Sequence, residues 1–468
     1  MFPLKYNLEY QPNTANLFAR LSHKPWAIFL DSGQPQGEYG RYDILVADPF
    51  ITISTAENLN VVLTEIVQNG QVTISHEDPF TILNGLLAPY KALSSSLPFS
   101  GGAVGYFGYD LMRQEAKLPN FALQTESFPQ MKIGIYDWVV VVDHREKTAC
   151  LVSHGFQQST HDRWSALCAL FDAPPIACAT KFKLTTPMTS NMDFNQYAQA
   201  FNKVKDYIIE GDCYQVNLAQ RFAAQAAGDS WIAYNKLREI SPAPFMAYMN
   251  FGGLQVLSGS PERFLQVVGY HVETRPIKGT RPRSDDKKQD QQYAADLQVS
   301  IKDKAENLMI VDLLRNDISK NCETGSVKAD KLFQLQSFAN VHHLVSIVTG
   351  TLQASKTAID LLRGCFPGGS ITGAPKLRAM QIIEELEPHR RGVYCGAIGY
   401  IGFDGNMDTN IAIRTAVYAT NEDIKTGEIS FYAGGGIVAD STLEKEYAET
   451  LDKASSMLKT MKYFKGSN

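Results

Sequence analysis

The stretch Glu273-Thr-Arg-Pro-Ile-Lys-Gly-Thr280 sets one lysine, Lys278, between Pro276 and Gly279. Proline fixes its own φ and biases the preceding residue toward extended backbone, whereas glycine permits a turn that other residues resist. This pattern predicts that Lys278 is held at the end of a strand. A lysine can act as a nucleophile when partial desolvation favours loss of its proton. We therefore consider Lys278 a candidate nucleophile, with a surface lysine in a turn as the alternative.

Two predicted helices carry acidic residues three positions apart, which places each pair on one helical face. The pairs are Asp303 with Glu306 and Glu446 with Glu449. Four carboxylates without a neighbouring histidine or cysteine suit Mg²⁺ and suit zinc poorly. Acidic pairs at this spacing are also common on solvated helices, so the metal hypothesis requires that the two helices meet.

Two glycine-rich segments could hold anions. In the segment from Cys365 to Lys376 the glycines resemble a phosphate loop, but Ala374 and Pro375 stand where such a loop has its lysine. Thr372 and Gly373 instead precede a predicted helix that runs through Glu387, whose first amides could bind a carboxylate. The second segment, 432–438, is a predicted strand that runs into three glycines, which can present backbone N–H groups to an anion.

Three further side chains complete the candidate chemistry. The segment 411–415 is predicted to be a strand, and an inward-facing Arg414 would clamp a carboxylate. Glu262 lies one strand ahead of Lys278, and direct pairing of the two strands would make it a general acid beside the nucleophile; a plain ion pair is the alternative. His342 and His343 are adjacent, so only one of them can face the buried side of a strand.

The elements that position these residues change in character along the chain. Short apolar runs separated by turn residues predict strands at 26–30, 43–47 and 50–54, and 133–142 is predicted to be one continuous strand paired with 148–153. A linker is expected within 155–190. Longer helices then alternate with strands, beginning with a helix over 193–210 and a strand over 215–222. The charged segment 281–292 is expected to be a solvated loop, with an active-site lid as the alternative.

The composition is that of a globular protein. The chain has 468 residues, with 44% hydrophobic and 20% charged residues, which predicts two domains or one large merged body. A net charge of −5 without basic runs argues against nucleic acid as a partner. The seven cysteines are scattered, and neither a signal peptide nor an apolar stretch long enough for a bilayer is found. We expect a cytoplasmic protein with reduced thiols and no membrane contact.

Together these motifs resemble the family of chorismate-utilising enzymes, which includes anthranilate synthase and isochorismate synthase. The resemblance runs from about residue 192 to 458 and is carried by 211–222, 260–264, 305–317, 368–376, 436–441 and 446–450. It implies two β-sheets packed face to face and flanked by helices, an α+β fold. It also implies an N-terminal region over 1–180 and a chorismate-binding catalytic domain over 190–462.

The resemblance implies a role for each candidate. Lys278 attacks C2 of chorismate and Glu262 protonates the leaving C4 hydroxyl; ammonia then displaces the lysine and gives 4-amino-4-deoxychorismate for p-aminobenzoate and folate synthesis. Glu306 and Glu449 hold Mg²⁺, with Asp303 and Glu446 nearby; Asp303 departs from the glutamate of many relatives. The residues that correspond to substrate contacts are His343, Thr372, Tyr394, Arg414 and Gly436.

Lys278 also distinguishes members of the family, because the anthranilate-forming members carry alanine there and the members that aminate C4 carry lysine. The chain has no glutaminase signature, so the resemblance implies a separate glutamine amidotransferase subunit. Relatives also hold tryptophan in a pocket that corresponds to Ser32, Tyr39, Gly40, Arg41, Tyr42, Pro244, Phe245 and Met246. The alternatives are an anthranilate synthase large subunit and a non-catalytic subunit that binds chorismate or tryptophan.

Overall fold

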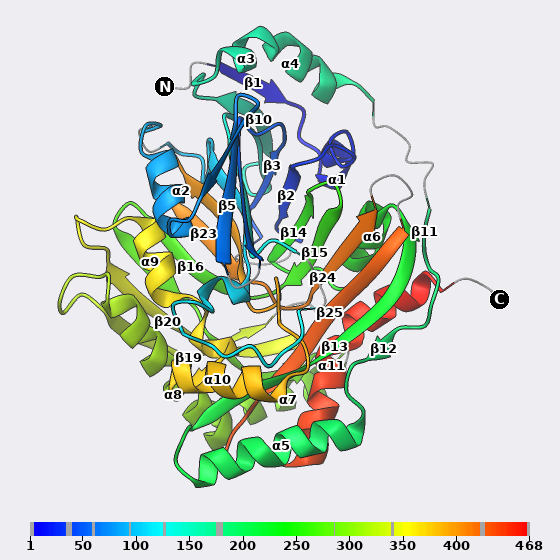
Figure 1. Cartoon of the computed structure of the whole chain (residues 1–468), viewed down its shortest axis with the longest axis vertical. Helices are drawn as coiled ribbons and strands as arrows, with labels where there is room; N and C mark the ends of the chain where they lie inside the picture. Colours follow the sequence, from blue (N-terminus) through cyan, green and yellow to red (C-terminus); the bar gives the residue numbers. More distant parts are fainter. Residues whose placement is uncertain are drawn as a thin grey trace.

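The computed structural model describes residues 4–33, 40–58, 61–92, 95–124, 128–174, 181–284, 286–337, 341–421 and 426–465. These residues form two sheets, of 13 and 12 strands, in which all pairings between named strands are antiparallel. Figure 1 shows helices around the sheets, with α3 and α4 at the top and α5 and α11 at the bottom. The predicted α+β fold with two large sheets is confirmed.

The first sheet combines strands from the beginning, middle and end of the chain. In spatial order its strands are β1 (Leu4–Leu8), β10 (Thr148–Ser153), β9 (Trp138–Asp143), β3 (Tyr42–Val46), β2 (Ala27–Asp31), β14 (Phe245–Asn250), β15 (Leu254–Ser260), β24 (Thr415–Asn421), β25 (Thr426–Ile437), β13 (Gln215–Gly228) and β11 (Phe182–Leu184). Two short strands, β12 (Thr189–Ser190) and β21 (Gly373–Ala374), also pair with β13.

The second sheet also combines strands from distant parts of the chain. Its order is β18 (Ile277–Pro282), β20 (Val341–Thr351), β17 (His271–Thr274), β16 (Arg263–Val268), β23 (Met407–Ile411), β22 (Ala397–Gly402), β7 (Gly102–Phe107), β8 (Met131–Tyr136), β4 (Ile51–Asn58), β5 (Val61–Gln68) and β6 (Gln71–Ser75), with β19 (Lys328–Ser337) on β20. Both sheets thus contain strands from either side of the predicted boundary near residue 185, and the division into two domains stays a prediction.

Helices cover the outer faces of the sheets. They are α1 (Ala15–Phe18), α2 (Pro79–Leu87), α3 (Gln158–Asp162), α4 (Trp164–Asp172), α5 (Phe194–Ile209), α6 (Ser230–Ile240), α7 (Lys287–Val299), α8 (Ile301–Ser319), α9 (Ala358–Cys365), α10 (Lys376–Leu386) and α11 (Leu443–Tyr463), with 3₁₀ turns at Tyr109–Met112 and Gly369–Ile371. None of the described helices has both the length and the apolar composition to cross a bilayer.

One apolar core lies between the two sheets, and others lie under the helices. Ile28 and Val139 of the first sheet pack there with Val104, Tyr106 and Ile398 of the second. The remaining cores join each sheet to its outer helices, with α8 and α9 on the second sheet and α6 and α11 on the first. The burial of both faces explains why many of these strands are apolar along their whole length.

Two sequence-based expectations about the fold are wrong. The run 133–142 is not one strand: β8 ends at Tyr136, β9 begins at Trp138, and the two belong to different sheets. An uninterrupted apolar run cannot reveal a crossing from one buried sheet to another. The pairing of β9 with β10 was predicted correctly.

The charged segment 281–292 does not form one continuous loop, because both of its ends belong to regular elements. Residues 281 and 282 belong to β18, and α7 begins at Lys287 after an Asp286 side chain that accepts a hydrogen bond from the Lys288 amide. The helix is polar on nearly all sides, with Leu297 as its buried residue. Helical periodicity is therefore almost absent from its sequence, which is why composition indicated a loop.

Candidate active site

Lys278 is the second residue of β18 and lies opposite Leu344 of β20. The register shifts between Lys278 and Thr280, and Gly279 between them has φ of +78°. A Cβ at Gly279 would lie 2.8 Å from Leu297 Cδ1 and 3.0 Å from Asp303 Cγ. Two features therefore require glycine at position 279: the left-handed backbone of the bulge and the close approach of α7 and α8.

The Lys278 ammonium donates a hydrogen bond to Glu306 Oε1 over 2.8 Å. Helix α8 is fixed beside the strand because Asn307 Nδ2 donates to the Leu344 carbonyl and Asn307 Oδ1 accepts from the Ser346 hydroxyl. Burial opposes the lysine charge, but the Glu306 carboxylate outweighs it and raises the pKa of Lys278. In the free chain the candidate nucleophile is thus protonated and held in place by a carboxylate.

Glu262 lies close to this pair but not on a paired strand. Strand β16 pairs with β17, and β18 pairs with β20, so the direct pairing of the Glu262 and Lys278 strands that was considered from the sequence is not formed. Glu262 is 7% exposed, and the Ser370 hydroxyl donates to its Oε1 over 3.3 Å. Burial raises the pKa of Glu262 to about 7, against the opposing charge of Lys278. A carboxyl group with such a pKa is suited to donate a proton near neutrality.

Arg414 does not lie within a strand, contrary to the expectation for 411–415. Strand β23 ends at Ile411 and β24 begins at Thr415, while Arg414 has φ of +50°. Its carbonyl oxygen accepts a hydrogen bond from the Gly259 amide, which fixes this unusual backbone conformation. Burial lowers the pKa of the guanidinium, and Glu262 is the anionic side chain that acts on it most. The arrangement supplies a desolvated cation for a carboxylate ligand.

Both His342 and His343 are buried, contrary to the expectation that only one of them faces a buried side. His343 contacts β18. It lies opposite Thr280, and its Nδ1 is 2.9 Å from the Thr280 hydroxyl. Burial, followed by the charge of Arg414, lowers the pKa of His343 to about 4. The imidazole is therefore neutral at pH 7 and can exchange hydrogen bonds without adding charge. His342 is buried too and contacts Ser337 and Asp290 instead.

Thr372 and Gly436 meet at β13. The Asn217 amide donates to the Thr372 carbonyl, and Asn217 lies opposite Gly436 in the pairing of β13 with β25. The buried Arg391 guanidinium holds both sides together, because it donates to the Asn217 carbonyl and to the Ile371 carbonyl. Tyr394 packs nearly parallel to Tyr432 of β25, with ring centroids 5.2 Å apart.

Gln215 is a site residue that sequence reasoning missed. It is fully buried at the start of β13, and a Cβ on Gly436 would lie 2.8 Å from its Nε2. Neither Nε2 nor Oε1 has a hydrogen-bond partner among the described residues, so the carboxamide is available to a bound molecule. Its position in the motif 211–222 was visible, but a glutamine in a strand carries no local signal of function. Ser370 was also missed, because a serine in a glycine-rich turn gives no local signal of a contact with Glu262.

Of the four candidate metal ligands, Glu446 and Glu449 lie together, and the helix that carries them approaches Glu306. Glu446 and Glu449 converge on Gly435, where a Cβ would lie 3.2 Å and 3.5 Å from their nearest oxygens. The charge of Lys453 acts on Glu262, Glu306 and Glu446, so α8 and α11 do approach the same space.

Each of these carboxylates has its own partner. Glu306 binds Lys278 and Asp303 binds Arg281, whereas Glu446 accepts from Ser441 and Glu449 pairs with Lys453. Among the described residues, no three His, Cys, Asp or Glu side chains are gathered into a metal-binding group. The oxygen donors fit Mg²⁺ in kind, and the metal site stays a prediction.

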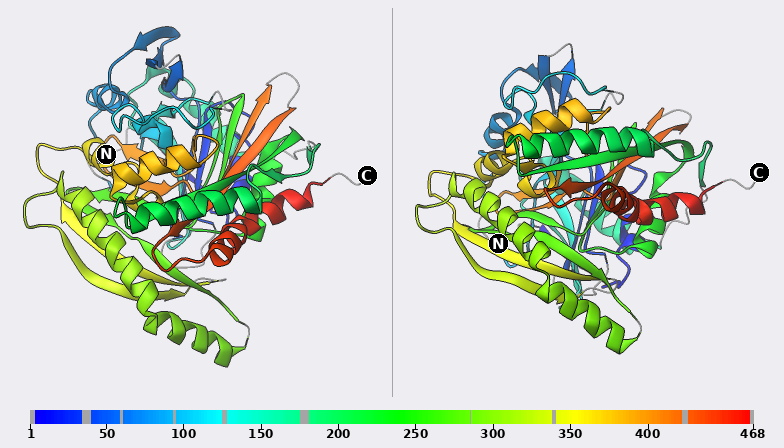
Figure 2. Two further views of the ribbon diagram at one scale, coloured as in Figure 1. Left: turned by 60° about the horizontal axis from the view of Figure 1, so that its bottom comes forward. Right: turned by 90° about the horizontal axis from the view of Figure 1, so that it is seen from below.

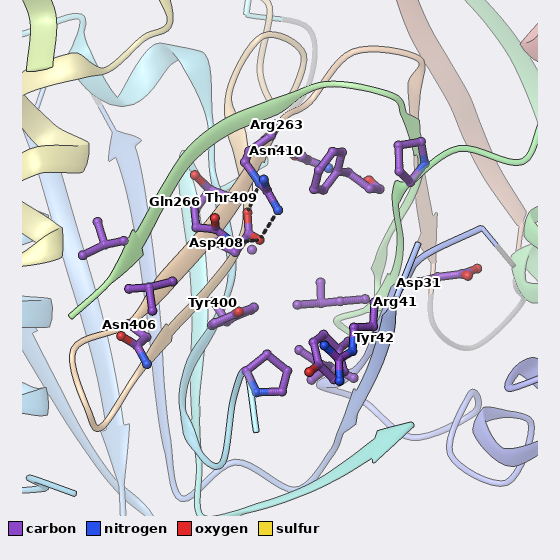
Figure 3. A pocket seen from close by; sticks show the side chains of 18 of the residues that line it. Asp31, Arg41, Tyr42, Arg263, Gln266, Tyr400, Asn406, Asp408, Thr409 and Asn410 are labelled. Carbon is purple, nitrogen blue, oxygen red and sulfur yellow. Dashed lines mark hydrogen bonds and ion pairs between the residues drawn. The ribbon is translucent and has the colours of Figure 1, made fainter. Parts of the chain in front are cut away.

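A separate cavity of about 520 Å³ lies between the two sheets, and Glu262 is not among its lining residues. Arg41, Tyr42, Pro244, Phe245 and Met246 line it, as the predicted tryptophan pocket requires. Figure 3 shows Arg41 and Tyr42 across the cavity from the ion pair of Arg263 and Asp408.

Two other residues that were predicted to line the pocket, Ser32 and Gly40, do not line this cavity. Ser32 is buried beside it and donates to the Asp43 carboxylate through its hydroxyl and its amide. Gly40 is buried and is not a lining residue, and Tyr39 lies outside the described residues.

The fold and this site define a chorismate-binding enzyme: the model of that family matches residues 27–459, and the chain belongs to the family. Among its relatives, aminodeoxychorismate synthase component 1 of Escherichia coli is 47% identical over 95% of both chains. The corresponding component of Salmonella typhimurium is 45% identical over 97% of this chain and 98% of its own. The crystal structure of anthranilate synthase component I from Streptococcus pneumoniae matches with a TM-score of 0.77, at 32% identity over 91% of this chain and 93% of its own.

Proposed function

We propose that this chain is the chorismate-aminating subunit of an aminodeoxychorismate synthase. It converts chorismate and ammonia into 4-amino-4-deoxychorismate and water, in the cytoplasm, for the synthesis of p-aminobenzoate and folate. The observation that carries the proposal is Lys278 in contact with Glu306 beside the protonatable Glu262. Full-length similarity to two proteins named aminodeoxychorismate synthase component 1 supports it.

The first half of the reaction uses Lys278 and Glu262. Arg414 and the amides near Gly436 bind the substrate carboxylates, and the Lys278–Glu306 ion pair must open so that Lys278 can lose its proton. The Lys278 amine forms a bond to C2, both conjugated ring double bonds shift, and the C4–O bond breaks. Glu262 gives its proton to the departing hydroxyl, which leaves as water. Chorismate is then joined covalently to Lys278.

The second half of the reaction releases Lys278 from the substrate. Ammonia forms a bond to C4, both double bonds shift back, and the C2–N bond to Lys278 breaks. One proton passes from the incoming nitrogen to the leaving amine, and Glu262 regains, by way of solvent, the proton that Lys278 gave up at the start. The sum is chorismate and ammonia to 4-amino-4-deoxychorismate and water. Glu306 and Glu449, with Asp303 and Glu446, would hold Mg²⁺, which would neutralise the ring carboxylate.

The test is turnover of chorismate by the isolated chain with an ammonium salt and Mg²⁺. Formation of 4-amino-4-deoxychorismate supports the proposal. Formation of fluorescent anthranilate would instead favour an anthranilate synthase subunit, and no turnover would favour a non-catalytic subunit.

We also propose that the cavity at Arg41 and Met246 takes tryptophan. Its wall combines apolar side chains with cations and carboxylates, which suits an amino acid with a large aromatic side chain. Native mass spectrometry of the purified chain, with tryptophan added, is expected to show one bound molecule. A mass equal to that of the bare chain under these conditions would contradict the proposal.

A further inference from the structure

Helix α10 carries two buried carboxylates one turn apart, and each of them holds a buried arginine. Glu384 lies within the helix, and Glu387 is the residue at which the helix ends. Glu384 accepts two hydrogen bonds from Arg113, and Glu387 accepts two from Arg391. All four residues are at most 4% exposed. Helix α10 packs together with α5 against β13, and Figure 2 shows the two helices side by side.

The guanidinium of Arg391 joins two segments of the candidate site. Besides its bonds to Glu387, it donates to the Ile371 carbonyl over 3.0 Å, directly before Thr372. It also donates to the carbonyl and to Oδ1 of Asn217, over 3.0 Å and 3.2 Å. The Asn217 amide in turn donates to the Thr372 carbonyl. These bonds close a ring that fixes the turn before α10 against β13.

The same ring of contacts reaches two further residues that are expected to bind the substrate. Asn217 lies opposite Gly436 in the pairing of β13 with β25. The guanidinium carbon of Arg391 lies 5.5 Å from the ring centroid of Tyr394, whose amide donates to the Arg391 carbonyl over 3.1 Å. A guanidinium against an aromatic ring is attracted to it. Arg391 is thus linked to three of the five expected substrate contacts.

Arg391 has no guanidinium nitrogen to spare for a ligand. Nε, Nη1 and Nη2 all donate to protein acceptors. Burial opposes the charge of Arg391, but the Glu387 carboxylate outweighs it and raises the pKa of the guanidinium. A buried arginine whose donors are all engaged is rigid, because any movement would leave a donor without a partner away from water.

Arg113 has the same chemistry but holds a different part of the chain. Besides Glu384 and Asp110, it donates to the Pro119 carbonyl over 2.7 Å and to the side chain that follows. Glu384 also accepts from two backbone amides of the segment 119–122. The pair therefore attaches this segment to α10. None of the groups that it contacts is a candidate site residue.

We propose that Arg391 is a positioning residue for substrate binding, whereas Arg113 serves stability alone. Arg391 fixes the three expected substrate contacts to which it is linked, which are Thr372, Tyr394 and Gly436. The inference rests on the proposed function, because it takes chorismate as the molecule that these residues bind.

The experiment compares Arg391→Lys with the matched variant Arg113→Lys. Each substitution keeps a positive charge beside its glutamate and removes the planar set of donors, so a lysine cannot reach all the acceptors of the arginine. Stability is measured by thermal unfolding. The apparent dissociation constant for chorismate is measured by titration calorimetry with Mg²⁺ and without ammonia, and KM is measured with saturating ammonia.

Both variants are expected to unfold at a lower temperature than the wild-type chain, because each disturbs a buried ion pair. Arg391→Lys should also raise the dissociation constant and KM for chorismate about tenfold or more, since groups that hold a substrate lose their effect when they are displaced. Arg113→Lys should leave both constants within about twofold of the wild-type values, however much stability it loses.

A milder variant, Asn217→Ala, covers the case in which Arg391→Lys does not fold. It keeps the ion pair of Arg391 with Glu387 and every backbone contact, and it removes the side-chain oxygen that accepts from Arg391. We expect the dissociation constant for chorismate to rise about threefold or more, the size of one hydrogen bond.

Equal loss of chorismate binding in Arg391→Lys and Arg113→Lys, at a temperature at which both are folded, would overturn the proposal, because binding would then follow stability. Unchanged binding in Arg391→Lys, or in Asn217→Ala where the lysine variant does not fold, would also overturn it. A wild-type chain that binds chorismate but forms another product would contradict the proposed function, whereas the dissociation constants would still decide the role of Arg391.

Discussion

Lys278 Nζ lies 2.8 Å from Glu306 Oε1, and the ion pair joins the candidate nucleophile to a predicted metal ligand. Each charge is stabilised by the other, since Glu306 raises the pKa of Lys278 and Lys278 lowers the pKa of Glu306 against the effect of burial. The pair keeps both groups charged in a half-buried site. For Lys278 to act as a nucleophile, its ion pair with Glu306 must first be broken.

Glu262→Gln removes the proposed proton donor while it keeps the shape of the side chain. We expect the rate with ammonia to fall about 10²- to 10⁴-fold, the usual contribution of a general acid. KM for chorismate should change little, because Glu262 contacts Ser370 and protonates only the departing oxygen.

The pH profile gives an independent check of Glu262. Burial raises its pKa from 4.5 to about 7, so the proton-donating form is present below pH 7 and is lost above it. The wild-type kcat/KM should therefore fall as pH rises through about 7, and the residual activity of Glu262→Gln should lack this decline. Glu77→Gln, an exposed residue, should keep it. An identical alkaline decline in Glu262→Gln would assign the ionisation to another group.

Arg414→Lys preserves the charge but removes the forked donor. The substitution should raise KM for chorismate about 10- to 100-fold, the size expected for a hydrogen bond to a charged group. The backbone strain should not change, because lysine and arginine are equally unfavourable at φ of +50°. Arg315→Lys on the exposed part of α8 is the control. Steady-state kinetics with saturating ammonia measure the effect, and an unchanged KM would place the carboxylates elsewhere.

Gly435→Ala tests whether Glu446 and Glu449 bind a cation. A methyl group there would press on both carboxylates, at 3.2 Å and 3.5 Å from their oxygens. The Mg²⁺ concentration for half-maximal rate should rise about tenfold, as it does when the support of a metal ligand is disturbed. Gly85→Ala, with open space around the added methyl, should leave it unchanged. Equal Mg²⁺ dependence in both variants would argue against these ligands.

The chemistry of the site was easier to predict than its geometry. The carboxylate pairs and Lys278 follow from residue types and spacing, since helical periodicity fixes which residues share a face. The contact between Lys278 and Glu306 does not, because it depends on the pairing of β18 with β20 and on the Asn307 hydrogen bonds that hold α8 there. Such contacts over long sequence separation have no local signal.

The errors have similar physical causes. Arg414 adopts a left-handed backbone that only its environment enforces, so alternating apolar residues around it predicted a strand. At Asp137 the chain passes from one sheet to the other, but the residues on both sides are equally apolar and buried, so the sequence shows no break. The carboxamide of Gln215 is buried and has no hydrogen-bond partner in the described part of the chain, and burial of one strand end cannot be deduced from a glutamine alone.

The central claim is that Lys278 becomes covalently bound to the substrate. Intact-mass spectrometry of the isolated chain, after incubation with chorismate and Mg²⁺ and without ammonia, tests it most directly. We predict an adduct that maps to Lys278, disappears when ammonia is added and is absent from Lys278→Ala. A Lys278→Ala chain that forms no adduct but still aminates chorismate at the wild-type rate would contradict the claim and show direct attack by ammonia.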